Sequence, residues 1–380
     1  MRGQVTKRGD NTWLVRIQGR GSDGKLKSVF SRTVHGTKKL ASEVLTEALR
    51  AKDTGTLVEP NQMTMNEYLD KWLETVAKNR LREHTFEGYK NWLDRYARPT
   101  LGETKIANLK PMDIQSLYSE MIGRGLRSRS VEYTHAILRT ALKQAVKWNI
   151  IMRNPCDLVE LPRKERKEMK ALSPEEASRF LAHAKADKCG IIFSFALATG
   201  LRPNEYLALR WSDVDWERGT ATVQRSLAWK AKGGFSFNEP KTSKSRRTVP
   251  LPTTLLRELR SHKIHQAEHR LSMGPDYTNL DLVFATDLGT PIHHRNLAQR
   301  HFAKILTKAS LPKFRLYDLR HSCATLLLSA NENPKVVSER LGHASIVLTL
   351  DTYSHVLPDM QQAATEKLEI LLFGVASNAR

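Results

Sequence analysis

A charged segment followed by a helix start divides this chain and restricts it to a multidomain fold. Residues 161–170 (LPRKERKEMK) form a charged linker. Ser173, Pro174 and Glu176 then supply a capping side chain, a proline at the first helical position and a glutamate that completes the cap. A new domain therefore begins near residue 171, and 380 residues are enough for two or three domains.

The first 58 residues have the pattern of a small module built from strands and one helix. Trp13, Val15 and Ile17 occupy alternate positions, as in a half-buried strand. Residues 19–24 (GRGSDG) predict a turn, and residues 27–34 predict a second strand. A helix over residues 37–53 would cover one face of these strands.

Helical periodicity dominates the next hundred residues. Thr64 and Glu67 form a capping box at the start of the first helix. Apolar and aromatic side chains then recur at helical spacing in four segments, 65–76, 89–96, 114–121 and 138–146. This pattern predicts an all-α domain whose aromatic side chains lie mainly in its core.

The charge balance favours a polyanionic partner, most simply nucleic acid. The chain has 61 Lys+Arg against 40 Asp+Glu, a net charge of +21, so such binding should depend on salt. The sequence shows no basic amphipathic helix of the kind that binds a membrane surface. Its most apolar stretch, 191–197, is too short to span a bilayer. The N-terminus lacks the apolar core of a signal peptide, so we expect a cytoplasmic protein, associated with the nucleoid through DNA.

The cysteines do not indicate a disulfide framework or a zinc site. Cys156, Cys189 and Cys323 are odd in number and far apart. We expect them to be reduced residues of the core.

Basic side chains in the first two domains are candidates for DNA contact. The candidates are Arg16, Arg20, Lys27, Arg124, Arg127 and Arg129. The last three stand beside small hydroxylic residues at a helix start, which suits phosphate contacts. The basic surplus of residues 1–58 either contacts DNA or only solvates the module. The linker is likewise either a solvated tether or a segment that follows a DNA backbone.

A spaced set of cations and one tyrosine indicates phosphate chemistry. Arg202 lies in ATGLRPNE, Arg320 in YDLRH, His343 in LGH and Tyr353 in LDTYSH. Breaking a phosphodiester requires neutralised non-bridging oxygens, a nucleophile and a proton for the leaving oxygen. Arginine donates two parallel hydrogen bonds and stays charged. If the fold brings these residues together, they can clamp a phosphate and attack it with a phenol, with no metal or other cofactor.

Five segments, in this order, resemble the tyrosine recombinases, the family of phage and mobile-element integrases. They are 198–209 (ATGLRPNEYLAL), 240–251 (PKTSKSRRTVPL), 316–325 (LYDLRHSCAT), 339–345 (ERLGHAS) and 350–355 (LDTYSH). The resemblance covers residues 62–360, and residues 1–58 look like the arm-type DNA-binding domain of many integrases.

The resemblance implies a fold and its domains. The expected fold has a small α+β N-terminal module, an all-α core-binding domain and a mainly α catalytic domain with a small β-sheet. The corresponding ranges are 1–58 for the arm-type domain, 62–158 for the SAM-like core-binding domain, 159–171 for the basic linker and 172–380 for the catalytic domain.

The resemblance also implies roles for the phosphate-binding residues. Arg202 and Arg320 would clamp the scissile phosphate, and Glu205 would orient the site. His343 would hydrogen-bond to the phosphate, and Gly342 before it reads as a helix C-cap.

The resemblance implies the general acid and the nucleophile in the same way. Lys241 would be the general acid for the departing 5′ oxygen, with Lys244 as a nearby alternative. The strand-like segments on either side predict that Lys241 lies at the tip of a β-hairpin. Tyr353 would be the nucleophile that forms a 3′-phosphotyrosyl link; Tyr317 and Tyr277 are the tyrosines to exclude.

One position departs from the family pattern. Tyr317 stands where the family commonly has histidine, three residues before Arg320. Tyrosine can donate a hydrogen bond to a phosphate, but it lacks the near-neutral acid–base character of imidazole. Tyr317 is therefore a candidate site residue whose role differs from that of the usual histidine.

The implied function is that of a site-specific recombinase that integrates or excises a mobile element. It would act as a homotetramer on double-stranded DNA with core and arm sites. A DNA-bending factor and an excisionase are further expected partners. The apolar segment 363–375 could dock on a neighbouring protomer or pack on its own domain.

Three other functions have weaker support in the sequence. A catalytically impaired DNA-binding regulator has only Tyr317 in its support. A type IB topoisomerase would not need the separate N-terminal module. A metal-dependent nuclease needs clustered carboxylates, and the nearest cluster, Asp213, Asp215 and Glu217, reads as a turn before a strand at residues 220–223.

Overall fold

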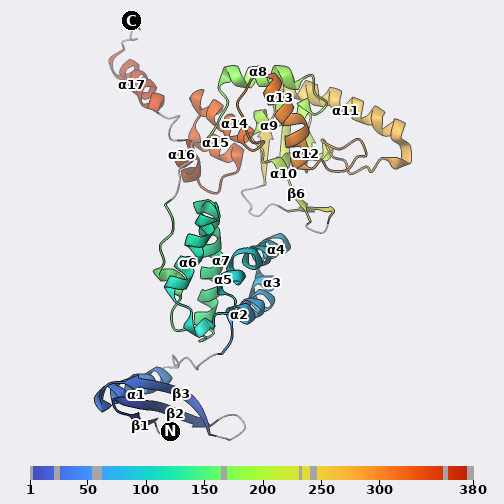
Figure 1. Cartoon of the computed structure of the whole chain (residues 1–380). Coiled ribbons are helices and arrows are strands. Elements are labelled where there is room, and N and C mark those ends of the chain that lie inside the picture. The colour runs from blue at the N-terminus through green and yellow to red at the C-terminus, as the bar shows by residue number, and fades with distance from the viewer. Residues whose placement is uncertain are drawn as a thin grey trace. The chain divides into compact units, whose positions relative to one another are not determined.

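The computed structural model describes residues 3–20, 26–53, 62–163, 169–230, 233–239, 246–353 and 358–374. The chain forms two compact units, Met1–Arg166 and Lys167–Arg380 (Figure 1). None of the helices in the described ranges has the length and the apolar run that a membrane crossing requires.

The N-terminal module is a three-stranded antiparallel sheet with one helix. Its elements are β1 (Gly3–Gly9), β2 (Thr12–Arg20), β3 (Leu26–His35) and α1 (Lys38–Asp53). Val15 and Ile17 are fully buried, and Val15 packs with Val34 of β3 and Ala41 of α1. The predicted alternation, second strand and helix are therefore confirmed.

Two features of this module differ from the sequence-based expectation. Strand β1 was not predicted, because its residues are mostly polar and exposed and only Val5 packs on the core. Gly19 and Arg20 still belong to β2, so the turn predicted for residues 19–24 does not begin where expected. Residues 21–25 lie outside the described residues.

The helical domain follows the predicted periodicity. Its α-helices are α2 (Met65–Trp72), α3 (Lys78–Arg80), α4 (Glu83–Trp92), α5 (Arg98–Leu101), α6 (Pro111–Gly123) and α7 (Ser128–Lys147). Short π-helical segments, Leu73–Ala77 and Leu93–Ala97, continue α2 and α4. The capping box is present, with the Glu67 amide donating to Thr64 Oγ1 and the Thr64 amide donating to Glu67 Oε2. Tyr68, Trp72 and Tyr118 are buried, as expected of core aromatics.

The C-terminal unit is mainly helical around one apolar core. Its longer helices are α8 (Pro174–Ala184), α9 (Gly190–Thr199), α11 (Thr253–Met273), α14 (Asp318–Ser329), α15 (Pro334–Leu341), α16 (Ile346–Tyr353) and α17 (Pro358–Phe373). The shorter ones are α10 (Pro203–Tyr206), α12 (His294–Asn296) and α13 (Ala303–Lys308). Helix α9 is apolar on nearly all sides and contacts α8, α11 and α14, so it forms the centre of this core. The capping box of Ser173 and Glu176 begins α8 as predicted. The three cysteines are buried and free, as expected.

The small strands of this unit correct one prediction. The strands are β4 (Val214–Asp215), β5 (Thr220–Val223), β6 (Ser226–Trp229), β7 (Phe235–Asn238) and β8 (Arg247–Pro250). Strand β7 pairs with β6, whereas β8 pairs with β5, where buried Val249 lies opposite buried Ala221. The strands that flank Lys241 therefore do not form the expected hairpin with each other. Lys241 and Lys244 themselves lie outside the described residues.

Candidate active site

A tight helix end positions the first arginine. Helix α9 ends at Gly200, whose φ of 66° is left-handed. A Cβ at Gly200 would lie 2.8 Å from a Leu341 methyl and 3.1 Å from the Cys323 sulfur, so packing as well as conformation requires glycine. Pro203 then begins α10, directly after Arg202.

Glu205 holds two arginines from distant segments. Its carboxylate lies 2.8 Å from Arg202 Nη1 and 2.8 Å from Arg247 Nη2, and it also accepts from the Arg202 amide at 2.9 Å. Burial alone would raise the pKa of Glu205, but the hydrogen bonds and charges of Arg247 and Arg202 outweigh burial and lower it. The carboxylate is therefore ionised at neutral pH and fixes both guanidinium groups, which is the geometry that an orienting role requires.

We expect Glu205→Gln to destabilise the C-terminal unit. The substitution removes the carboxylate charge that pairs with the mostly buried Arg247 and the half-buried Arg202, and loss of one partner of a buried pair costs about 3 kcal/mol. Because the folded-state pKa of Glu205 is lowered, its stabilisation is present above the usual carboxyl range and is lost as pH falls through the lowered value.

Urea unfolding at several pH values measures this prediction. The difference between wild type and Glu205→Gln should shrink as the solution is acidified below the usual glutamate range. Glu217→Gln, at an exposed glutamate of the same unit, is the matched control. Equal stability of wild type and Glu205→Gln at pH 7 would contradict the proposed role of the carboxylate.

Arg247 is a site residue that the sequence analysis missed. Its Nε donates to the Arg340 carbonyl oxygen at 2.7 Å, and a Cβ at Gly342 would lie 2.9 Å from its Nη1. One signal was available, because alternation in β8 places Arg247 on the same face as the buried Val249. The partner of its guanidinium, Glu205, could not be read from that pattern.

Arg320 is the most deeply buried cation of the site. Its side chain is 1% exposed at the start of α14, and its Nη1 donates to the Gly200 carbonyl oxygen at 2.9 Å. Burial, with the nearby charge of Arg202, lowers the pKa of Arg320 to about 10, so it remains a cation at neutral pH. Among the described residues its buried Nη2 has no hydrogen-bond partner. An unsatisfied buried donor next to a second arginine is suited to an anion.

His343 is held as a neutral imidazole beside these arginines. It follows Gly342, whose φ of 66° ends α15 and confirms the predicted C-cap. Burial and the charges of Arg320, Arg202 and Arg247 lower the pKa of His343 to about 4. Its Nδ1 lies 2.8 Å from the Thr349 hydroxyl. With that hydroxyl donating, the ring proton resides on Nε2 and can be donated to an anion.

Tyr353 ends α16 with its side chain 1% exposed. Its hydroxyl lies 2.8 Å from Nδ1 of His321, a contact that the sequence analysis did not anticipate. Burial raises the pKa of Tyr353, and the charge of Arg320 opposes that rise. The structure therefore brings the predicted tyrosine into the same electrostatic cluster as the predicted arginines.

Tyr317 and Tyr277, the two tyrosines to exclude as nucleophile, occupy different surroundings. Tyr317 is 39% exposed and packs edge-on against His321, with ring centroids 5.3 Å apart. Burial alone would lower the pKa of Arg202, but Glu205 and Tyr317 together raise it, so Tyr317 also belongs to the cluster. Tyr277 instead packs against His269 of α11.

Replacing Tyr317 with phenylalanine should slow DNA cleavage about fivefold. The hydroxyl can supply one hydrogen bond to a bound phosphate, worth about 1 kcal/mol. Single-turnover cleavage of a nicked substrate measures the change. An unchanged rate would remove Tyr317 from the active site.

The predicted DNA-contacting residues lie apart from this cluster in sequence. Arg124 and Arg129 pair with Glu120 and Glu132 on the surface of the helical domain, and Arg127 immediately precedes α7. Arg16 is half-buried in β2. Arg20 and Lys27 are placed in β2 and β3, but their side chains are outside the described set.

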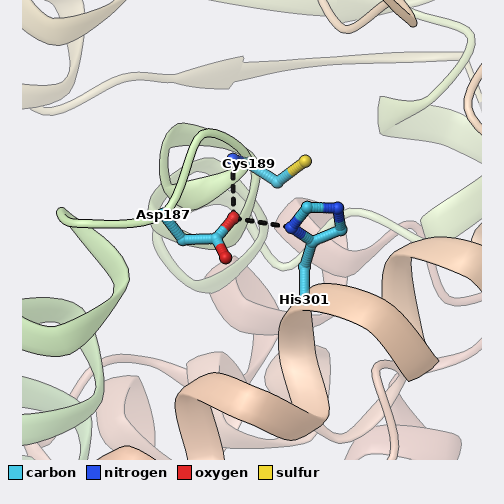
Figure 2. Close-up of side chains that lie close together, drawn as sticks. All are labelled: Asp187, Cys189 and His301. Carbon is cyan, nitrogen blue, oxygen red and sulfur yellow. Dashed lines mark hydrogen bonds and ion pairs between the residues drawn. The ribbon is translucent and has the colours of Figure 1, made fainter.

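The described residues include one trio with metal-ligating atoms, and its contacts are structural. Asp187, Cys189 and His301 have these atoms within 4.8 Å of one another (Figure 2). The Asp187 carboxylate accepts from the Cys189 amide at 2.8 Å and contacts His301 Nδ1 at 2.8 Å. Burial, with the charge of Asp187, raises the pKa of the Cys189 thiol to about 11. The thiol is therefore protonated at neutral pH. Through its contacts with the Cys189 amide and His301, Asp187 connects the start of α9 to the π-helical segment Leu297–Phe302.

The acidic cluster behaves as the sequence indicated. Asp213 is buried and pairs with Arg225, and Asp215 accepts from the amides of Glu217 and Arg218. These carboxylates shape the turn into β5 rather than converge on a shared cation.

Comparison with known proteins identifies the family of this chain. The model of the phage integrase family matches residues 170–360, and that of the phage integrase N-terminal SAM-like domain matches residues 64–122. A tyrosine recombinase XerC-like protein of Caldanaerobacter subterraneus subsp. tengcongensis is 31% identical, over 96% of this chain and 97% of that protein. The chain belongs to the phage integrase family of tyrosine recombinases. It is a site-specific recombinase, and DNA is its partner.

Solved structures share the fold of this recombinase. The Tn1549 transposon integrase in complex with a circular intermediate DNA has a TM-score of 0.69 at 22% identity, covering 80% of this chain and 99% of that one. A lambda integrase tetramer bound to a Holliday junction has a TM-score of 0.55 at 17% identity, covering 90% and 95%. The mainly helical multidomain architecture expected from the sequence is therefore confirmed.

Proposed function

We propose that this recombinase integrates or excises a mobile element through a 3′-phosphotyrosyl intermediate on Tyr353. The observation that carries the proposal is the convergence of Arg202, Arg320, His343 and Tyr353. The charge of Arg202 acts on Arg320, both arginines lower the pKa of His343, and the charge of Arg320 acts on Tyr353. No similar support exists for a catalytically impaired regulator, because the nucleophile and both arginines are present.

The two arginines and His343 form the phosphate clamp of this proposal. The free Nη2 of Arg320 and the partly exposed guanidinium of Arg202 donate to the non-bridging oxygens. Neutral His343 adds one hydrogen bond from Nε2. Glu205 keeps Arg202 in place, and its own charge is directed to Arg202 and Arg247.

Tyr353 then attacks the phosphorus of the clamped phosphate. A bond forms between its phenolic oxygen and phosphorus, and the bond from phosphorus to the 5′ oxygen breaks. Lys241 protonates the departing 5′ oxygen; this assignment rests on the sequence, since residues 240–245 are outside the described set. The ester conserves the free energy of the broken bond, so a 5′-hydroxyl can reverse the step without ATP.

In this proposal, different domains bind different DNA sites. Residues 62–158 and 172–380, joined by the linker 159–171, bind core sites, and residues 1–58 bind arm sites. Arg16, Arg20, Lys27, Arg124, Arg127 and Arg129 contact phosphates there. The ion pairs of Arg124 and Arg129 are exposed and therefore weak, so phosphate can replace the glutamates.

Four protomers assemble on DNA in this proposal, with a DNA-bending factor and an excisionase as further partners. Helix α17 leaves a group of large apolar side chains exposed: Leu368, Ile370, Leu371, Leu372 and Phe373. Such a surface favours docking on a neighbouring protomer over packing on its own domain. The similarity to a lambda integrase tetramer on a Holliday junction supports the same assembly.

Covalent trapping tests the proposed function. Nicked DNA from the flanks of the source element loses its 5′-hydroxyl fragment after cleavage, so the linked intermediate accumulates. A denaturation-resistant adduct whose linked peptide contains Tyr353 is the expected result. Firm binding without any adduct would overturn the proposal and favour the regulator.

A further inference from the structure

The hydroxyl of Tyr353 has one well-placed acceptor among the described residues. Nδ1 of His321 on α14 lies 2.8 Å from the Tyr353 hydroxyl on α16, with ring centroids 5.9 Å apart. The proposed phosphate clamp, formed by Arg202, Arg320 and His343, does not use His321. Tyr317, one turn earlier on the same side, carries a phenol and has no near-neutral base to offer.

We propose that His321 is the general base that removes the phenolic proton of Tyr353 during cleavage and returns it during rejoining. The proposal rests on the proposed role of Tyr353 as nucleophile. A phenol with a pKa near 10 attacks poorly until its proton is removed, and burial makes that removal harder here by raising the pKa of Tyr353. A base at hydrogen-bond distance from the hydroxyl can remove this proton directly.

The proton balance of the step is complete. His321 with its proton on Nε2 accepts the Tyr353 proton at Nδ1 as the bond from oxygen to phosphorus forms. The 5′ oxygen leaves with the electron pair of its bond to phosphorus and takes a proton from Lys241. In rejoining, the 5′-hydroxyl gives its proton to Lys241, attacks phosphorus and displaces Tyr353, which recovers its proton from His321.

The surroundings of His321 keep it in the basic form. Burial and the charges of Arg315 and Arg320 lower the pKa of His321, while Asp318 opposes them. Tyr317 and Tyr353 face its ring, and His343 lies near enough for the two histidines to influence each other. The imidazole is therefore neutral at pH 7.

The test compares His321→Asn with wild type in single-turnover cleavage of the nicked DNA. Asparagine keeps an acceptor near the position of Nδ1 but cannot take up the proton. We expect cleavage at pH 7 to fall by about 10² to 10⁴ with DNA binding unchanged. The residual rate should rise with pH over the range in which the wild-type rate is level. His265→Asn, at an exposed histidine of α11, is the matched control.

A substrate with sulfur in place of the bridging 5′ oxygen separates the base from the acid. Its thiolate leaves without a proton, so the substrate rescues loss of a general acid but not loss of a base. His321→Asn should stay slow on this DNA, whereas Lys241→Ala should recover. His321→Gln is the second variant, and the comparison uses whichever variant retains DNA binding.

The outcomes keep the two proposals apart. A binding-competent His321 variant that cleaves at the wild-type rate, or that recovers on the sulfur substrate, would overturn the base assignment and leave Tyr353 as nucleophile. An adduct formed by Tyr353→Phe would instead overturn the assignment of Tyr353 as nucleophile, on which the base assignment rests.

Discussion

Tyr353→Phe should abolish the covalent protein–DNA adduct and leave DNA binding intact. Phenylalanine keeps the ring, which packs in the small core of Ala324, Leu328, Val337 and Leu341, and removes only the hydroxyl. The lost hydrogen bond to His321 lowers the free energy of unfolding by about 1 kcal/mol. Catalysis, in contrast, loses the proposed nucleophile, so we expect no intermediate to form. A denaturing gel of protein trapped on nicked DNA measures the adduct, and a native gel measures binding.

Tyr317→Phe is the matched control for this experiment. It removes one phenolic hydroxyl of the same site and should still form the adduct, although more slowly. If Tyr353→Phe formed the adduct, the nucleophile would be another tyrosine. Tyr277 is a poor substitute because it packs on α11, so Tyr317 would be examined first.

Arg320→Lys should reduce the cleavage rate about a thousandfold, the effect of losing one well-placed donor to the transition state. The guanidinium performs two tasks, because Nη1 holds the Gly200 carbonyl oxygen while Nη2 remains available for the phosphate. A lysine supplies one charged point and cannot span both positions. DNA affinity should change little, since many other phosphate contacts contribute to binding.

Single-turnover cleavage at saturating protein separates these effects of Arg320→Lys. Arg257→Lys, at an exposed arginine of α11, is the control for the loss of a guanidinium as such. Cleavage by Arg320→Lys within a few-fold of wild type would remove Arg320 from the clamp. Loss of DNA binding together with cleavage would indicate misfolding, and thermal unfolding of the variant checks for it.

Local chemistry made the helix boundaries predictable. Thr64 with Glu67, Ser173 with Glu176, and Gly342 each act within one helical turn, so a few neighbouring residues contain the whole signal. The strands and their pairing were harder to predict from the sequence. Strand β1 lacks a clear apolar alternation, and the partners of β7 and β8 depend on which buried side chains complete a sheet.

The sequence by itself determined the family of this protein and indicated its chemistry. Arg202, Arg320, His343 and Tyr353 stand in recognisable segments, and their side chains are those that the proposed phosphate clamp and nucleophile require. Only the tertiary structure decided how that chemistry is arranged. The Glu205–Arg247 pair spans 42 residues and the His321–Tyr353 contact spans 32, so neither follows from local spacing. Burial and neighbouring charge, which set the pKa of each group, arise only when distant segments pack together.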